Sequence, residues 1–194
     1  MSVIKEEIRD QIIDSASKIF SRFGFKKTTM DEIAMSMHKG KSSIYYYFKS
    51  KEEIFEAVID KEVVIFKNDV TQILAPITSP KEKLRAYITT RMYALKRMSN
   101  FYEAIRNEYL SHLDFINKIR VKYDENEVIT IAQLLKSGID SGEFQLDDPQ
   151  LAAMAIVTTM RGLEIPLFWS GEQQDIEKRI DSLLTLLFYG IVKK

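Results

Sequence analysis

The chain has 194 residues, of which 45% are hydrophobic and 29% charged, and its 28 basic side chains balance its 28 acidic ones. This composition is ordinary for a soluble globular protein, and the length allows one large domain or two small ones. Because there is no cysteine, a disulfide framework and a thiolate metal site are excluded, which fits a reducing compartment. The N-terminus is charged, and no run of about 18 uncharged apolar residues occurs. We therefore expect a cytoplasmic protein without a membrane span.

Helical patterns fill the first fifty residues. Apolar residues recur at helical spacing up to Phe23, and Gly24 is expected to end this helix in a left-handed conformation. Thr29 and Glu32 have the spacing of a capping box, which predicts a short helix over residues 30–37. Residues 38–40 indicate a tight turn, and a second short helix is expected to end near Phe48.

The rest of the chain predicts longer helices. Ser50 with Glu53 opens one that Pro76 ends, and the Ser79-Pro80 pair opens the next. The pattern stays helical over residues 84–113, with breaks expected near residues 99–100 and near residue 111. A further helix is expected from residue 117 or 121 to residue 142.

The C-terminal third predicts two more helices. Asp148-Pro149 opens a helix to about Trp169, in which Pro166 is expected to produce a kink or an end, and a last helix covers residues 175–189. No segment has the period of a strand. The chain is therefore predicted to be all-α, with about nine helices: an N-terminal three-helix helix-turn-helix domain followed by a C-terminal helical bundle domain.

Charge is distributed unevenly along the chain. Residues 24–51 hold six lysines and two acidic residues, a net charge of +4, so the remainder carries −4. The helix expected over residues 41–48 also has more aromatic and hydroxyl side chains than one buried stripe can use. A helix of about 20 residues followed by two short ones fits a DNA-binding unit whose third helix enters the major groove. The alternative is a plain three-helix bundle with solvated charges.

The same segment resembles the N-terminal signature of the TetR family of transcriptional repressors. The resemblance covers about residues 8–55 and rests on two runs: Thr28-Thr29-x-x-x-Ile33-Ala34, and Ile44-Tyr45-x-Tyr47-Phe48-Lys49-Ser50-Lys51-Glu52-Glu53-Ile54. It implies a homodimer that binds double-stranded DNA at a palindromic operator. It also implies a DNA-binding domain over residues 1–52 and an effector-binding and dimerisation domain over residues 53–194.

Carried over by position, the resemblance implies a set of DNA contacts. Thr29 would cap the second helix and bind a phosphate, and the side chains at the start of the third helix would reach base edges. Tyr45 and Tyr46 would contact bases or backbone, Tyr47 a phosphate, and Lys51 a phosphate at the start of the fourth helix. Alternatively, Tyr45 or Tyr47 packs mainly against the first helix. The full set is Thr29, Lys41, Ser42, Ser43, Tyr45, Tyr46, Tyr47 and Lys51, with Ile33, Ala34, Ile44 and Phe48 expected in the core.

The turn departs from the family pattern. His38, Lys39 and Gly40 stand where the family commonly has glycine, an apolar residue and a residue that caps the helix. His tolerates a left-handed conformation, and Gly is an acceptable N-cap. The Lys39 side chain, which replaces an apolar plug, must extend towards water or shift the turn.

Two further sets of candidates lie in the C-terminal part. Aromatic and methionine side chains with a few polar groups suggest a pocket for a small apolar or amphipathic effector, although the same residues would also suit a plain core. The candidates are Met92, Phe101, Tyr102, Tyr109, His112, Tyr123, Met160 and Glu164. The last two helices are apolar over more than one side, which predicts a dimer interface at Met154, Val157, Leu183, Leu184 and Leu187, with burial inside the monomer as the alternative.

These patterns favour one function over two others. No glycine-rich phosphate loop, nucleophile elbow or pair of metal-spaced histidines occurs, so we expect no enzyme, no catalytic residue, no cofactor and no metal site. A helical adaptor that binds protein partners without DNA would explain the helices but not the +4 segment. We therefore expect a ligand-responsive DNA-binding repressor that a small effector releases from its operator.

Overall fold

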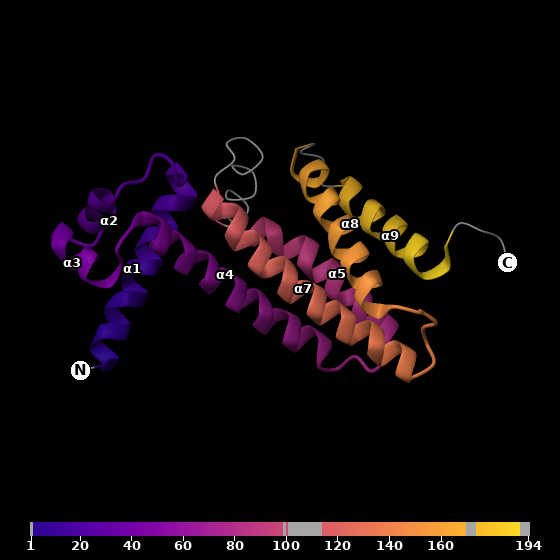
Figure 1. Cartoon of the computed structure of the whole chain (residues 1–194). Coiled ribbons are helices and arrows are strands. Elements are labelled where there is room, and N and C mark those ends of the chain that lie inside the picture. The colour runs from indigo at the N-terminus through magenta and orange to yellow at the C-terminus, as the bar shows by residue number, and fades with distance from the viewer. Residues whose placement is uncertain (1, 99, 101–113, 170–173, 191–194) are drawn as a thin grey trace. The chain divides into compact units, whose positions relative to one another are not determined.

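The computed structural model describes residues 2–98, 100, 114–169 and 174–190, which form helices and connecting loops without a strand (Figure 1). The eight helices within these residues, labelled as in Figure 1, are α1 (Ser2–Phe23), α2 (Met30–Ser36), α3 (Lys41–Tyr47), α4 (Lys51–Leu74), α5 (Pro80–Arg97), α7 (Asp114–Asp140), α8 (Pro149–Trp169) and α9 (Gln174–Tyr189). The all-α prediction is confirmed, with an N-terminal helix-turn-helix and a helical C-terminal part.

Most expected helix ends agree with the structure. Gly24 has φ +79° and its N–H donates to the Phe20 carbonyl, so it ends α1 as its position predicted. The expected break near residue 99 matches the end of α5, whereas the one near residue 111 lies outside the described residues. Helix α8 continues through Pro166 to Trp169, the end that the sequence predicted, so Pro166 does not end it and the expected kink stays a prediction. A proline inside a helix removes one hydrogen bond of the ladder, and α8 continues past this loss.

The chain divides into two compact units. Unit 1 comprises Met1–Asn68 and Leu95–Val121, and unit 2 comprises Asp69–Ala94 and Lys122–Lys194. The boundary expected after residue 52 separates a DNA-binding part from an effector-binding part. It divides the chain by function rather than by packing, and it stays a prediction.

The core of unit 1 joins the first four helices. Ile12, Ala16 and Phe20 of α1 are at most 1% exposed. They belong to a buried set with Ile33 and Ala34 of α2, Ile44 of α3, Phe48, and Ile54, Phe55 and Val58 of α4. The four residues expected in the core of the helix-turn-helix are all buried, so that prediction is confirmed. This packing fixes which faces of α2 and α3 remain for a partner.

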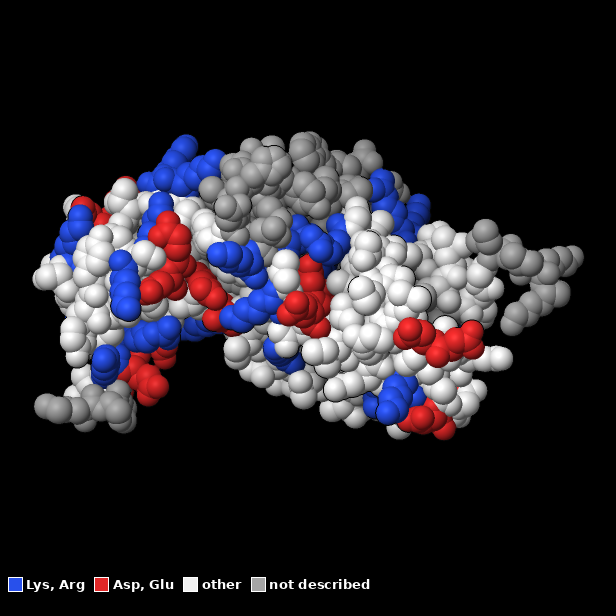
Figure 2. Space-filling view, viewed as in Figure 1, with Lys and Arg blue, Asp and Glu red and all other residues white. Residues whose placement is uncertain are grey.

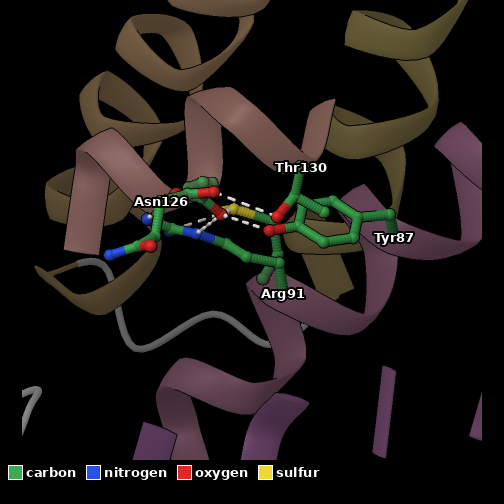
Figure 3. A network of polar contacts seen from close by, with 6 residues as sticks. Tyr87, Arg91, Asn126 and Thr130 are labelled. Atoms are coloured by element: carbon green, nitrogen blue, oxygen red, sulfur yellow. Dashed lines mark hydrogen bonds and ion pairs between the residues drawn. The ribbon is translucent and has the colours of Figure 1, made fainter. Parts of the chain in front are cut away.

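Unit 2 has a mixed core of apolar side chains and buried charges. Ile88 of α5, Ile131 of α7 and Met160 of α8 are fully buried. Next to them, the Arg91 guanidinium and the Tyr87 hydroxyl of α5 converge on the Glu127 carboxylate of α7 (Figure 3). The charged groups are held inside the helix bundle by each other and by hydrogen bonds.

Candidate nucleic-acid interface

The start of α2 is fixed by a complete capping box. Thr29 is extended (φ −120°, ψ 160°), and its Oγ1 accepts a hydrogen bond from the Glu32 N–H at 3.2 Å. The Glu32 carboxylate accepts the Thr29 N–H at 2.7 Å and the Thr29 hydroxyl at 3.0 Å. Thr29 is exposed, so it can meet a phosphate only by exchanging part of this box. Its structural role as a cap is confirmed, and its phosphate contact stays a prediction.

The turn between α2 and α3 adapts to its unusual sequence through His38. This residue has φ +54°, the left-handed conformation that the family pattern assigns to glycine. The Lys39 N–H donates to the Ala34 carbonyl at 3.0 Å, and the Lys39 side chain is half-exposed. Gly40 then opens α3 in an extended conformation without a side-chain cap. The turn therefore keeps its tight geometry although no apolar plug occupies position 39.

The recognition candidate α3 presents its predicted DNA-contacting residues on one side and core residues on the other. Ile44 and Phe48, four residues apart, point into the core, at 0% and 3% exposure. Lys41, Ser42, Tyr45 and Tyr46 are exposed, while Ser43 and Tyr47 are half-buried. Tyr47 packs edge-on against the Tyr46 ring, with 5.0 Å between centroids. Of the two tyrosines left open by the sequence, Tyr45 is thus the more accessible.

The Lys41 ammonium is not free at this surface. It forms an ion pair of 2.8 Å with the Asp31 carboxylate of α2, and this hydrogen bond raises the pKa of Lys41. Both side chains are more than half exposed, so the pair is weak and water can compete for it. Asp31 therefore competes with DNA for the Lys41 ammonium.

Lys51 makes internal contacts at the start of α4. Its ammonium donates to the backbone carbonyls of Phe25 and Thr28, both at 2.8 Å, and lies 4.2 Å from the centroid of the Phe25 ring. Two of its three N–H groups are therefore used inside the chain. Lys51 thus holds the loop between α1 and α2 against α4, and its expected phosphate contact stays a prediction.

Two cations of α1 lie beside α3, and sequence reasoning missed both. The Lys5 ammonium is 5.0 Å from the Tyr46 ring centroid, and the Arg9 guanidinium is 4.9 Å from the Phe48 ring centroid. Their spacing of one helical turn was the available signal, but the acidic residues around them concealed it. Figure 2 shows why net charge is a poor guide here, since basic and acidic side chains alternate over α1 to α3.

Half of the effector candidates fall on residues that the structure does not describe. Met92 and Met160 are buried, and Tyr123 is half-buried. The remaining candidates, Phe101, Tyr102, Tyr109 and His112, together with the Glu164 side chain, lie outside the described residues.

One buried and one partly exposed ion pair are polar features of unit 2 that sequence reasoning did not identify. Arg91 and Glu127 pair at 3.0 Å with side-chain exposures of 8% and 10%, and the Arg161 guanidinium lies 2.8 Å from the Asp124 carboxylate. Asp124 and Glu127 are three residues apart on α7 and so share a face. The two pairs therefore bring α5 and α8 to the same part of α7, and the Arg91 guanidinium also lies 3.9 Å from the Met92 sulfur.

The predicted interface residues on α8 and α9 divide by exposure. Met154 and Leu187 are exposed at 52% and 39%, and Leu183 is half-buried. Val157 and Leu184, at 3% and 1%, are buried within the single chain. Leu151 and Leu186 are exposed at 63% and 51% and extend the apolar surface. A dimer through these helices stays a prediction.

The described part of the chain holds neither a cluster of metal-ligating side chains nor a membrane-spanning helix. It contains no group of three or more His, Asp or Glu side chains that could hold a metal ion. Among its helices, none is both long enough and apolar enough to cross a membrane.

Comparisons with known proteins agree with this geometry. The family model described as "Bacterial regulatory proteins, tetR family" matches residues 12–58. The uncharacterized HTH-type transcriptional regulator YhgD of Bacillus subtilis is 24% identical over 197 residues, which cover 100% of this chain and 97% of YhgD. The HTH-type transcriptional repressor KstR2 of Mycolicibacterium smegmatis is 28% identical over 141 residues, covering 72% of this chain and 68% of that protein.

A solved structure extends the likeness over the whole fold. The transcriptional regulator FadR from Bacillus subtilis, in complex with stearoyl-CoA, superposes with a TM-score of 0.71. It is 26% identical and covers 94% of this chain and 98% of that one. The matched residues 12–58 contain the capping box, the turn and α3, so the likeness includes the surface described above. These likenesses do not favour a helical adaptor.

Proposed function

This chain belongs to the TetR family of transcriptional regulators, and we propose that it is a repressor that an amphipathic small molecule releases from its operator. The observation that carries the proposal is the helix-turn-helix in which α3 buries Ile44 and Phe48 and exposes Lys41, Ser42 and Tyr46. Such a helix can enter a major groove, where its side chains read base edges. Thr29, Ser43, Tyr45 and Tyr47 are proposed to flank these contacts.

The proposed effector is a long-chain acyl-CoA thioester. An acyl chain needs an apolar environment, and its polar head needs charged partners. Unit 2 contains both kinds of side chain, since Met92 and Met160 are buried there and the Arg91 guanidinium, which pairs with Glu127, lies 3.9 Å from the Met92 sulfur. The stearoyl-CoA complex of the B. subtilis protein supports the same class of ligand.

The proposed regulator acts as a homodimer. The exposed residues Leu151 and Met154 of α8 and Leu187 of α9 form an apolar surface that a second copy would cover. A two-fold dimer of these helices makes a four-helix interface and presents two copies of α3 to half-sites about 34 Å apart on a palindrome. A repressor of this kind binds DNA without catalysing a reaction. Its proposed location is the cytoplasm, because the operator lies there.

The proposed release of DNA follows from thermodynamic linkage between the DNA-binding site and the effector site. The effector lowers DNA affinity only by as much as it prefers the released conformation. Helix α4 runs from Lys51, next to the helix-turn-helix, into unit 2 at its C-terminal end. We take a shift of α4 as the step that moves the two copies of α3 out of register with successive grooves.

A gel-shift assay tests the proposal with the DNA upstream of the coding gene. The protein is expected to bind this DNA in a salt-dependent way, because phosphate contacts release counterions. Palmitoyl-CoA is expected to release the DNA, while coenzyme A and palmitate serve as controls for the head and the chain. A reporter under the same upstream DNA is expected to rise when the gene is deleted.

Three results would contradict parts of the proposal. Absent or salt-insensitive binding would favour the helical adaptor. Release by coenzyme A alone, or by none of the three compounds, would reject the acyl-CoA effector. A reporter that falls on deletion of the gene would indicate an activator.

A further inference from the structure

We propose that Lys5 and Arg9 of α1 bind the DNA backbone beside the groove that α3 enters, and so form a second row of contacts. The proposal rests on the DNA-binding function and adds to it a surface outside the predicted set of contacts. It is independent of the identity of the effector.

The first observation is a change of residue type along one face of α1. Ile13, Arg9 and Lys5 are each four residues apart and therefore share a face of the helix. Ile13 is buried at 3%, next to Ile12 and Ala16, but Arg9 and Lys5 are exposed. The face that packs into the core in the middle of α1 thus becomes cationic near its N-terminus, where it passes α3.

The second observation is how these cations are held. Lys5 lies over the ring of Tyr46, which is 68% exposed, and Arg9 lies over the ring of the buried Phe48. An aromatic ring attracts a cation that lies over its face within about 6 Å of the ring centroid. Because the ring attracts the charge as a whole, the N–H groups of both side chains stay available for phosphate oxygens. The rings therefore order the cations without neutralising them.

The third observation concerns the lysines first expected at this surface. Lys41 is paired with Asp31, and Lys51 donates to the carbonyls of Phe25 and Thr28. Internal partners thus compete with a phosphate for both ammonium groups, whereas Lys5 and Arg9 are held over aromatic rings that leave their N–H groups available. The α1 pair is thus better prepared for the backbone than the two lysines that the sequence favoured.

A salt titration of DNA affinity tests the proposal. The probe is a duplex selected by the wild-type protein from a random-sequence pool. Each phosphate contact contributes about 0.9 to the slope of log affinity against log salt. The double variant Lys5→Ala and Arg9→Ala is expected to lower the magnitude of this slope by about 1.8 for each half-site. It is also expected to weaken binding to the selected duplex and to an unrelated duplex by similar factors, because phosphate contacts carry no sequence information.

Lys18→Ala is the matched control, since Lys18 is exposed on α1 and does not belong to the row of Lys5, Arg9 and Ile13. It is expected to leave the slope unchanged, and circular dichroism checks that all variants fold. An unchanged slope in the double variant, or an equal fall with Lys18→Ala, overturns the inference. A wild-type protein that enriches no duplex overturns the DNA-binding function itself, whereas an enriched duplex with an unchanged slope rejects only the role of α1.

Discussion

A lysine at the start of a helix, such as Lys51, can either bind a phosphate or donate hydrogen bonds to backbone carbonyls of its own chain. Its position at the start of α4 suits a phosphate, because the helix dipole and the ammonium have the same sign there. The structure instead uses the ammonium to hold two carbonyls of the loop that precedes the N-cap of α2. Lys51 therefore acts on the DNA-binding surface through the position of Thr29 and α2.

This role predicts a loss of stability on truncation. Hydrogen bonds to a charged group are worth about 1.5–3 kcal/mol each, and Lys51 donates two, so Lys51→Ala is expected to lower the free energy of unfolding by about 3 kcal/mol. Urea denaturation at a fixed protein concentration measures the change. The neighbouring exposed residue gives the control, since Lys49→Ala is expected to stay within about 0.5 kcal/mol of the wild type. If Lys51→Ala weakens only DNA binding and leaves the stability unchanged, the phosphate role is restored.

Tyr87 predicts a pH dependence at the alkaline end. Burial raises the pKa of Tyr87 above its ordinary value, and the nearby Glu127 carboxylate acts in the same direction. Above about pH 10 the unfolded chain releases this proton while the folded chain keeps it, so stability falls as pH rises. Between pH 9 and pH 11, the wild type is expected to lose about 1.4 kcal/mol more than Tyr87→Phe.

Chemical denaturation at the two pH values gives this difference, and other titrating groups cancel between wild type and variant. Tyr46→Phe, which removes an exposed phenol, is the matched control and is expected to follow the wild type. An equal loss in wild type and Tyr87→Phe would show that the buried hydroxyl does not titrate differently on folding.

At the residue scale, helix caps could be predicted from the sequence, but contacts between residues far apart in the sequence could not. The Thr29–Glu32 capping box and the left-handed Gly24 depend on residues within one helical turn, so the sequence was sufficient to predict them. The contact between Lys51 and Phe25 spans 26 residues, and the Arg91–Glu127 pair spans 36. No pattern in a single sequence indicates such pairs, which is why Lys51 was assigned to a phosphate and Arg91 was overlooked.

At the scale of elements, the end of α7 illustrates packing that restricts one position to glycine. A Cβ on the buried Gly138 would overlap the ring of Phe144, which stacks on Phe188 of α9 at 6.3 Å between centroids. Gly162 of α8, in contrast, is exposed, and a Cβ there meets nothing within 4 Å. The same substitution should therefore act in opposite directions in two helices of unit 2.

Gly138→Ala is expected to destabilise the protein by about 1–3 kcal/mol, because the Phe144 ring must leave its place. Gly162→Ala is expected to stabilise it by about 0.5–1 kcal/mol through helix propensity alone. Thermal unfolding followed by circular dichroism distinguishes the two. Equal effects of the same sign would mean that Phe144 is free to move and that the end of α7 is not locked.

Helix positions were largely predictable because periodicity and end signals are local. The ends of α2, α4 and α5 lie within about two residues of expectation, which is the usual uncertainty of a helix end. The turn at residues 38–40 was the weakest point, and His38 resolved it by adopting a positive φ. What the sequence could not provide was the face of α1 that meets α3, since that depends on how the helices pack.

At the scale of the whole molecule, the proposed recognition of an operator depends on the proposed dimer. The sequence predicted an interface on α8 and α9 from their width of apolar surface, but it could not separate residues that fill the protomer's own core from those that remain outside. Val157 and Leu184 belong to the first class and Met154 and Leu187 to the second. A charge at Leu184 would therefore disrupt folding rather than test association.

The double variant Met154→Glu and Leu187→Glu is expected to be a folded monomer, because four carboxylates would meet across a two-fold interface. Light scattering coupled to gel filtration measures the mass. Ile129→Glu provides the control, because it charges an equally exposed apolar residue, at 52%, on α7 and should leave the dimer intact. Since a dimer binds its second half-site as an intramolecular event, the monomeric variant should lose affinity for a palindrome while keeping the wild-type affinity for a single half-site. A double variant that remains dimeric, or dissociation by Ile129→Glu, would move the interface away from α8 and α9.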